Sequence, residues 1–159
     1  MKKLWNHAPY PIWSLSTLDR EGKCNMNICS YVTPISMKPK EFIVGIYYNT
    51  QTFENISKTK LGLLQLLAQD QYHLVRQLGK KSSLKTNKMK KILKEESVGT
   101  YNSYTYLEEC IGYIELEFYK IIKTSGDHAI GIARMKSHVS LHNKQTLTLQ
   151  DLQEKNIIL

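Results

Sequence analysis

The sequence has 159 residues, of which 42% are hydrophobic, and this length and composition fit one folded domain over residues 1–159. No apolar run approaches the roughly 20 residues that cross a bilayer, and the N-terminus lacks the apolar stretch of a secretory signal. We therefore expect a cytoplasmic protein without membrane contact. Cys24, Cys29 and Cys110 have no CxxC spacing, so we predict neither a disulfide framework nor a metal site.

The formal net charge of +8 is concentrated in one segment. Residues 80–94 hold seven lysines and no acidic residue, and removing those seven from the 22 basic residues leaves 15 against 14 acidic residues. A nucleic-acid-binding domain usually spreads its basic residues over a docking face, so we expect no nucleic acid partner. The segment is interpreted as a solvated loop and short helix, with an electropositive rim for a phosphate-bearing ligand as the alternative.

The N-terminal third predicts an antiparallel meander. Residues 11–18 alternate between apolar and polar side chains, as a strand does, and residues 19–22 form a turn in which Gly22 can take a positive φ. Residues 25–36 resume as a strand that ends near Pro34. The nearly continuous apolar run 41–48 then indicates a buried strand.

Two short helices are predicted next, on either side of a strand. Thr52 has the right chemistry for the N-cap of a helix that begins at Phe53. Residues 61–67 are apolar and indicate a second buried strand. Residues 71–78 have apolar side chains at helical spacing, and Gly79 is the predicted helix stop.

Residues 106–122 contain a strict alternation that predicts a strand with one buried face. Ile114, Leu116 and Phe118 share that face. Glu115 and its neighbours on the other face are interpreted as the solvated side of the sheet, not as catalytic carboxylates.

The C-terminal part begins with a hairpin. Residues 125–127 form its turn, and residues 128–139 return as a strand. Residues 148–151 have the pattern of a capping box that begins a short terminal helix. Many strands, few short helices and hairpin connections together imply a closed antiparallel barrel with helical insertions.

Several common functional motifs are absent from the sequence. There is no GxGxxG, no GxxxxGK[ST] and no GxSxG, which argues against a Rossmann dinucleotide site, a P-loop and a hydrolase nucleophile elbow. The chemistry must therefore be sought in a different arrangement of residues.

Four segments together resemble a known family. They are SLSTLDREGKCNMNICSYVTPISMKP, FIVGIYYNTQTFENI, LGKKSSLKTNKM and SGDHAIGIARM, within roughly residues 10–140. In this order and spacing they resemble the flavin reductase-like family of FMN-binding proteins. The resemblance implies an all-β dominated fold, an antiparallel FMN-binding split β-barrel of six or more strands with a few short peripheral helices. It also implies FMN as cofactor, NAD(P)H as co-substrate, and a homodimer that passes electrons to a monooxygenase or another acceptor.

The resemblance assigns roles to individual residues. A helix N-terminus with hydroxyl groups suits a phosphate, and the family's phosphate site falls on Thr50, Gln51, Thr52 and Asn55. The strand that contacts the flavin ring falls on Asn25, Met26, Asn27, Ile28, Cys29 and Ser30. Ser82 and Lys88 match positions that meet phosphate or NAD(P)H, and His128 matches a residue beside the reacting face of the flavin, the candidate catalytic residue. Material for the dimer interface is offered by Tyr31, Tyr47, Tyr48 and Phe118.

The sequence also departs from the family pattern. Asn49 stands where the family often has an arginine before the phosphate site, which predicts weaker FMN binding, and Ala133-Arg134 replaces a frequent Gly-Glu on the substrate side. Three alternatives remain open. They are a split-barrel flavin- or heme-binding protein without reductase turnover, a pyridoxamine-phosphate oxidase-like enzyme, and a basic nucleic-acid-binding barrel.

Overall fold

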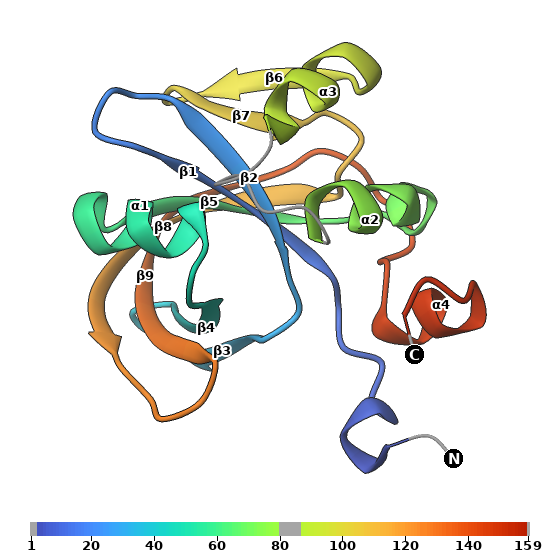
Figure 1. The fold of residues 1–159 in the computed structure, drawn as a ribbon, viewed down its shortest axis with the longest axis horizontal. Helices are drawn as coiled ribbons and strands as arrows, with labels where there is room; N and C mark the ends of the chain where they lie inside the picture. Colours follow the sequence, from blue (N-terminus) through green and yellow to red (C-terminus); the bar gives the residue numbers. More distant parts are fainter. Residues whose placement is uncertain (1–2, 80–86, 159) are drawn as a thin grey trace.

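The computed structural model of the protein describes residues 3–79 and 87–158. Its centre is a seven-stranded antiparallel sheet in the order β2-β1-β5-β8-β9-β4-β3, which coils into a barrel (Figure 1). The strands are β1 (Trp13–Leu18), β2 (Cys24–Cys29), β3 (Val32–Ser36), β4 (Glu41–Tyr47), β5 (Leu61–Leu66), β8 (Gly112–Ile122) and β9 (His128–Ser140). The successive strands β2 and β3 are the two ends of this order. The sheet therefore does not close between β2 and β3, which agrees with the split barrel that the family resemblance implies and not with the closed barrel that the strand pattern alone predicts.

The split follows from a break in a segment that was predicted to be one strand. Residues 25–36 divide at Ser30 and Tyr31, so that β2 pairs with β1 whereas β3 pairs with β4. Pro34 lies inside β3, not at a strand end, opposite Phe42. Proline is tolerated there because β3 is an edge strand, in which one row of N–H groups needs no partner.

The barrel interior is filled by apolar side chains from both halves of the chain. Ile114, Leu116 and Phe118 of β8 all belong to this core, as the alternation predicts. One end of the barrel is covered by helix α1 (Gln51–Thr59), whose Ile56 is fully buried in the same core. The barrel and its helix are thus a single packing unit.

A second apolar core lies outside the barrel, beneath the helices η2 (Gln69–His73), α2 (Leu74–Gly79), α3 (Lys88–Glu95) and α4 (Leu149–Glu154). The short helix η1 (Leu4–Asn6) has no buried residue and takes no part in this core. Met26, Leu78, Ile92 and Leu152 meet in this core. Gly79 is the last residue of α2 and not the residue after it, whereas the predicted capping box at α4 is confirmed. In the described part of the chain, no helix is long and apolar enough to cross a membrane.

A two-stranded hairpin covers the outer face of the sheet. Its strands are β6 (Val98–Tyr101) and β7 (Tyr104–Leu107), so the predicted strand 106–122 is wrong at its start, where a turn separates β7 from β8. The side chain of Gln65 joins the hairpin to the barrel, because its Oε1 accepts a hydrogen bond from Leu107 N and its Nε2 donates one to Ser16 Oγ. The side chains of Gln65 and Ser16 are both fully buried.

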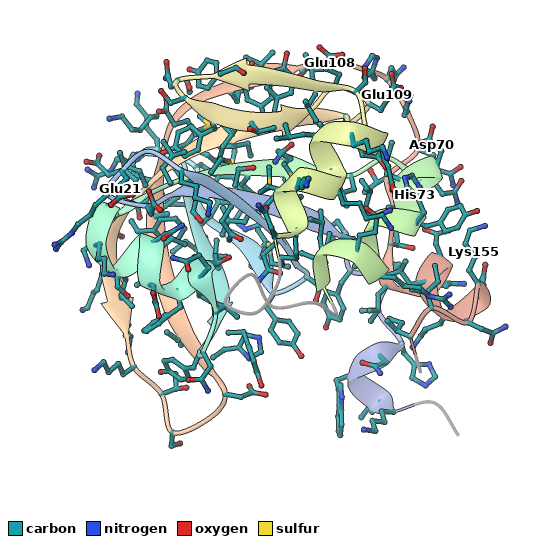
Figure 2. The ribbon with its side chains drawn as sticks, turned by 45° about the horizontal axis from the view of Figure 1, so that its top comes forward. Glu21, Asp70, His73, Glu108, Glu109 and Lys155 are labelled. Atoms are coloured by element: carbon teal, nitrogen blue, oxygen red, sulfur yellow. The ribbon has the colours of Figure 1, made fainter. Side chains whose placement is uncertain are left out.

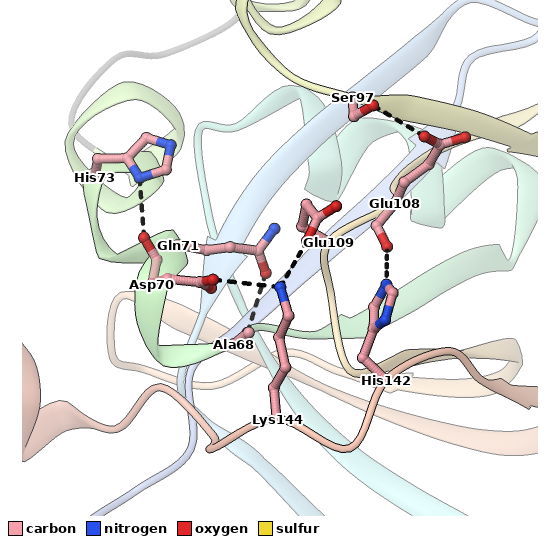
Figure 3. A network of polar contacts seen from close by, with 9 residues as sticks. All are labelled: Ala68, Asp70, Gln71, His73, Ser97, Glu108, Glu109, His142 and Lys144. Atoms are coloured by element: carbon pink, nitrogen blue, oxygen red, sulfur yellow. Dashed lines mark hydrogen bonds and ion pairs between the residues drawn. The ribbon is translucent and has the colours of Figure 1, made fainter.

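Polar contacts hold the segment after β9 against the barrel. Lys144 bridges Asp70 and Glu109, and His142 bonds the carbonyl oxygen of Glu108 (Figure 3). Figure 2 shows Asp70, Glu108 and Glu109 on one side of the molecule, with Glu21 of the β1–β2 turn on the other. These exposed contacts hold the segment in place, and they lie away from the predicted flavin site.

Candidate functional site

A cavity of about 260 Å³ lies where the end of β2, the link to β3, the end of β4 and the start of β9 meet. Its walls are formed by Leu15, Asn27, Ile28, Cys29, Ser30, Tyr31, Gly45, Ile46, Tyr47, Thr52 and His128. Six of these were predicted as site residues from the sequence. The split in the barrel thus opens at the place where the sequence pattern indicates the flavin.

The strand predicted to contact the flavin ring contributes only its second half to the cavity. Asn27 to Ser30 line the cavity, whereas Met26 is fully buried in the second core and Asn25 lies against α1. Burial raises the pKa of Cys29 to about 12, so its thiol stays protonated at neutral pH. Cys29 is therefore an apolar wall of the cavity and not a nucleophile.

Helix α1 directs its N-terminus towards one end of the cavity. The residue that caps it is Thr50 and not the predicted Thr52, since Thr50 Oγ1 accepts a hydrogen bond from Phe53 N at 3.1 Å. The same hydroxyl donates to Tyr47 O at 2.7 Å, which fixes the helix to the end of β4. The N–H groups of Gln51 and Thr52 have no acceptor within the helix, as in any first turn, and can bind an anion.

Thr52 lines the cavity one residue inside the helix. Asn25 Nδ2 donates a hydrogen bond to Thr52 Oγ1 at 3.1 Å. Because this bond uses a lone pair of the hydroxyl oxygen, the hydroxyl proton of Thr52 can be donated to a ligand. Asn25 therefore orients the Thr52 hydroxyl.

Asn55 and Gln51 form a support beneath the same turn. Asn55 Nδ2 donates to Thr17 Oγ1 at 3.0 Å, and Asn55 Oδ1 accepts from Gln51 Nε2 at 2.8 Å. Asn55 is buried and does not line the cavity. Its amide is thus used to fix α1 on β1, and the structure does not bring it to the cavity with Thr52.

Of the two residues predicted from the basic segment, only Lys88 falls within the described structure, and it does not line the cavity. Ser82 lies outside the described residues. Lys88 begins α3, where its Nζ donates a hydrogen bond of 2.7 Å to Leu78 O, near the end of α2. Burial lowers the pKa of Lys88 to about 8. This lysine joins two helices across the second core.

His128 stands at the mouth of the cavity, as the first residue of β9 and opposite Tyr47 of β4. Its Nδ1 lies 2.6 Å from Asp127 Oδ1, and this hydrogen bond lowers the pKa of the Asp127 carboxyl. An ionised carboxylate only accepts hydrogen bonds, so Nδ1 carries the proton and Nε2 is left to meet a ligand.

Two aromatic residues at this mouth were not predicted as ligand contacts. The rings of Tyr31 and Tyr47 each contact His128 edge-on, with ring centroids 5.1 Å apart. The sequence did contain a signal for this packing, namely Gly45 inside an apolar strand. A Cβ atom at Gly45 would come within 2.8 Å of Tyr31 Cβ, so glycine is required for Tyr31 to pack there.

The comparison with known families decides which family the chain belongs to. A family model described as the flavin reductase like domain matches residues 5–155. The chain belongs to the flavin reductase like domain family. No curated protein matches the chain by sequence.

Solved structures share the fold of this flavin reductase like domain at low sequence identity. An FMN-binding protein from Thermus thermophilus is 19% identical, with 90% of this chain and 77% of that chain covered and a TM-score of 0.76. The styrene monooxygenase flavin reductase from Pseudomonas putida S12 is 18% identical, with 91% and 89% covered and a TM-score of 0.75. An NADH:FAD oxidoreductase from Streptomyces globisporus is 8% identical, with 90% and 82% covered and a TM-score of 0.78. These likenesses confirm the predicted split barrel.

The residues at the cavity fit a flavin mononucleotide. One end offers free N–H groups and the Thr52 hydroxyl, which suit a phosphate, and the other end offers amide and apolar groups of β2, which suit a flat ring. Among the described residues no lysine or arginine lines the cavity, and Lys88 Nζ is bonded to Leu78 O. A phosphate bound here would have its charge met by the helix N-terminus and by hydroxyl groups.

Proposed function

We propose that this flavin reductase like domain binds FMN and works as an NAD(P)H:flavin oxidoreductase. The observation that carries the proposal is the position of the cavity between the N-terminus of α1 and the end of β2, with the Thr52 hydroxyl oriented by Asn25. The absence of a glycine-rich dinucleotide loop from the sequence favours a mononucleotide.

The roles of the residues follow from their places. The N–H groups of Gln51 and Thr52 and the Thr52 hydroxyl hold the phosphate, and the segment from Asn27 to Ser30 contacts the ring edge. His128 Nε2 orients the co-substrate at the mouth. The chemistry that bound FMN supplies is the acceptance of a hydride from NAD(P)H, which needs no protein nucleophile. The protein excludes water from the ring and fixes its orientation.

The experiment that tests the activity is an anaerobic reduction. FMN-loaded protein is mixed with NADH or with NADPH, and the visible flavin absorbance is followed. We expect one of the two nucleotides to bleach it within seconds to minutes and His128→Ala to slow the bleaching more than it weakens FMN binding. If dithionite bleaches the flavin and neither nucleotide does, the protein is a flavin carrier without reductase turnover.

The proposal includes a homodimer. The structure shows which of the expected interface residues are exposed to a partner. Phe118 is 1% exposed inside the barrel, so it is not available to a partner, contrary to its expected place in the interface. Tyr31 and Tyr47 are exposed, as an interface role requires. A further exposed apolar surface lies at Met37, which is 85% exposed and lines an apolar groove of about 460 Å³ together with Trp13 and Met135. A second copy of the chain on this groove would bury Met37 and the apolar wall of the groove.

The acceptor of the electrons is proposed to be a second protein. The relative from Pseudomonas putida S12 is the flavin reductase of a styrene monooxygenase. We infer an acceptor of the same general kind, a flavin-dependent monooxygenase. Stimulation of NAD(P)H oxidation by a purified partner is the test.

A further inference from the structure

The loop that leads to His128 lies outside the barrel core. It joins β8 to β9 over residues 123–127 and extends beyond the rest of the sheet (Figure 1). All of these loop residues are exposed, so no buried side chain of the loop itself holds it in place. Exposed loops are more mobile than the strands they connect. A histidine at the end of such a loop needs other contacts to keep one position at the mouth of the cavity.

Tyr48, directly after β4, supplies these contacts. Its backbone N–H donates a hydrogen bond of 3.0 Å to Asp127 O, next to His128 in the chain. Its side-chain hydroxyl accepts from Thr124 N at 2.9 Å and donates to Thr124 O at 3.4 Å. Tyr48 was expected at the dimer interface, and in the structure it is half-buried with its hydroxyl bonded within the chain. One residue thus holds the loop near both of its ends.

The side chain of Thr124 extends this contact to His128. Thr124 Oγ1 donates a hydrogen bond to His128 O and accepts one from Gly126 N. The hydroxyl of Tyr48 therefore fixes the backbone of Thr124, and the hydroxyl of Thr124 fixes the backbone of His128. Two successive hydrogen-bonded contacts connect Tyr48 with the candidate catalytic residue, although Tyr48 and Thr124 do not line the cavity.

On its other side, Tyr48 contacts helix α1. Its ring meets the ring of Phe53 edge-on, with centroids 5.1 Å apart and planes at 79°. Phe53 lies in the first turn of α1, and its N–H bonds the capping hydroxyl of Thr50. Tyr48 thus lies between two parts of the candidate site, the helix turn that faces one end of the cavity and the loop that leads to His128.

We propose that Tyr48 is a positioning residue, which couples the first turn of α1 to the position of His128. Its ring packs on Phe53, and its hydroxyl holds the loop through Thr124. A ligand that orders the first turn of α1 therefore also orders His128, because the contacts between them are continuous. The role of His128 beside a flavin rests on the proposed function, whereas the link between Tyr48 and His128 belongs to the protein without a ligand.

The first test uses NMR spectroscopy of the protein without FMN. Tyr48→Phe keeps the ring on Phe53 and removes the hydroxyl, and Thr124→Val removes the hydroxyl that bonds His128 O. Tyr119→Phe is the matched control, because its hydroxyl donates to Glu41 at the other end of β4. Amide hydrogen exchange is measured at Thr124 and Gly126. The ring resonances of His128, which the neighbouring rings of Tyr31 and Tyr47 shift, are recorded in the same samples.

We expect Tyr48→Phe to speed exchange at the Thr124 amide about tenfold, since this amide loses its acceptor. In Tyr48→Phe and in Thr124→Val the His128 resonances should move towards those of a free histidine. Both readouts should stay at their wild-type values in Tyr119→Phe. His128 resonances that stay unchanged in folded Tyr48→Phe overturn the coupling.

The second test is a double-mutant cycle on the FMN-loaded protein. Tyr48→Phe should slow flavin reduction by the nucleotide at least about fivefold, and its affinity for FMN should stay within about twofold of the wild type. The double variant Tyr48→Phe/His128→Ala should be no slower than His128→Ala, because Tyr48 acts through His128. Losses that multiply in the double variant contradict this. If neither nucleotide reduces the flavin, the reductase function fails alone, and the NMR measurements still decide the coupling.

Discussion

The two threonines at the start of α1 have different tasks, although the sequence does not distinguish them. Thr50 caps the helix, and Thr52 faces the cavity with its hydroxyl proton available. We predict that Thr52→Ala weakens FMN binding by about 1.5–3 kcal/mol, the value of a hydrogen bond to a charged group. Thr52→Ser, which keeps the hydroxyl, should bind nearly as the wild type does. Fluorescence titration of FMN measures both.

Thr50→Ala should lower the stability of the protein and not its affinity for FMN. It removes a helix cap, so the free energy of unfolding should fall by about 1 kcal/mol in urea denaturation. A Thr52→Ala protein that is folded and binds FMN with unchanged affinity would place the phosphate elsewhere.

Lys88 makes the stability of the protein depend on pH in a defined direction. Its pKa is about 8 in the folded protein, against an ordinary value of 10.5. Between these two pH values the unfolded chain binds the proton and the folded protein has lost it, so stability rises with pH across this window. We predict that the wild type gains stability relative to Lys88→Met between about pH 8 and pH 10.5 in urea denaturation.

The control for this prediction is Lys90→Met, on the exposed side of the same helix. The difference in unfolding free energy between the wild type and Lys90→Met should stay constant over that pH range. If the two variants show the same pH profile, the buried ammonium of Lys88 is not the cause.

The structure brings the segment from Asn27 to Ser30 and His128 together at one cavity, whereas their contact with a flavin stays a prediction. Asn55 and Lys88 were predicted as ligand contacts, but each is bonded to a distant part of the chain, Thr17 and Leu78 respectively. A polar side chain in a motif has the same letters whether it faces a ligand or a buried partner, so sequence alone does not separate these cases.

At the level of elements, the β6–β7 hairpin depends on one buried glutamine. Gln65→Met should leave the Leu107 N–H without an acceptor, which costs about 1–3 kcal/mol of unfolding free energy. Amide hydrogen exchange should also become faster in the hairpin than in β8. Gln150→Met, at an exposed position on α4, should change the stability by less than about 0.5 kcal/mol. Equal losses in the two variants would show that the buried bonds contribute little.

The elements themselves were largely predictable, because alternation and apolar runs determine which segments become strands. The errors occurred where the pairing between strands determines where a strand begins or ends. Residues 25–36 have a continuous strand pattern, yet the chain changes partner at Ser30 and Tyr31 to pair with β4. The alternating pattern of residues 106–122 likewise gives no sign of the turn that separates β7 from β8. Strand partners are chosen by distant residues, so a local pattern does not reveal such breaks.

For the whole molecule, the exposed apolar surface around Met37 leads to a prediction about assembly. Met37→Lys places a charge on the groove proposed as the dimer interface, beside the existing cation of Lys40. We expect sedimentation equilibrium to show a dimer for the wild type and at least about tenfold weaker association for the variant. Leu93→Lys, which replaces an exposed leucine on α3, is the matched control. A wild-type monomer at micromolar concentration, or a dimer that Met37→Lys leaves intact, contradicts this interface.

Whether the cavity beside α1 holds FMN is tested by reconstitution. Purified protein is incubated with excess FMN and passed through a desalting column, and the visible spectrum and mass of the retained ligand are recorded. We predict flavin absorbance that elutes with the wild-type protein, a released ligand with the mass of FMN, and clearly less flavin on Thr52→Ala. A wild-type protein that elutes without flavin, or that retains heme or pyridoxal phosphate in preference to FMN, would contradict it.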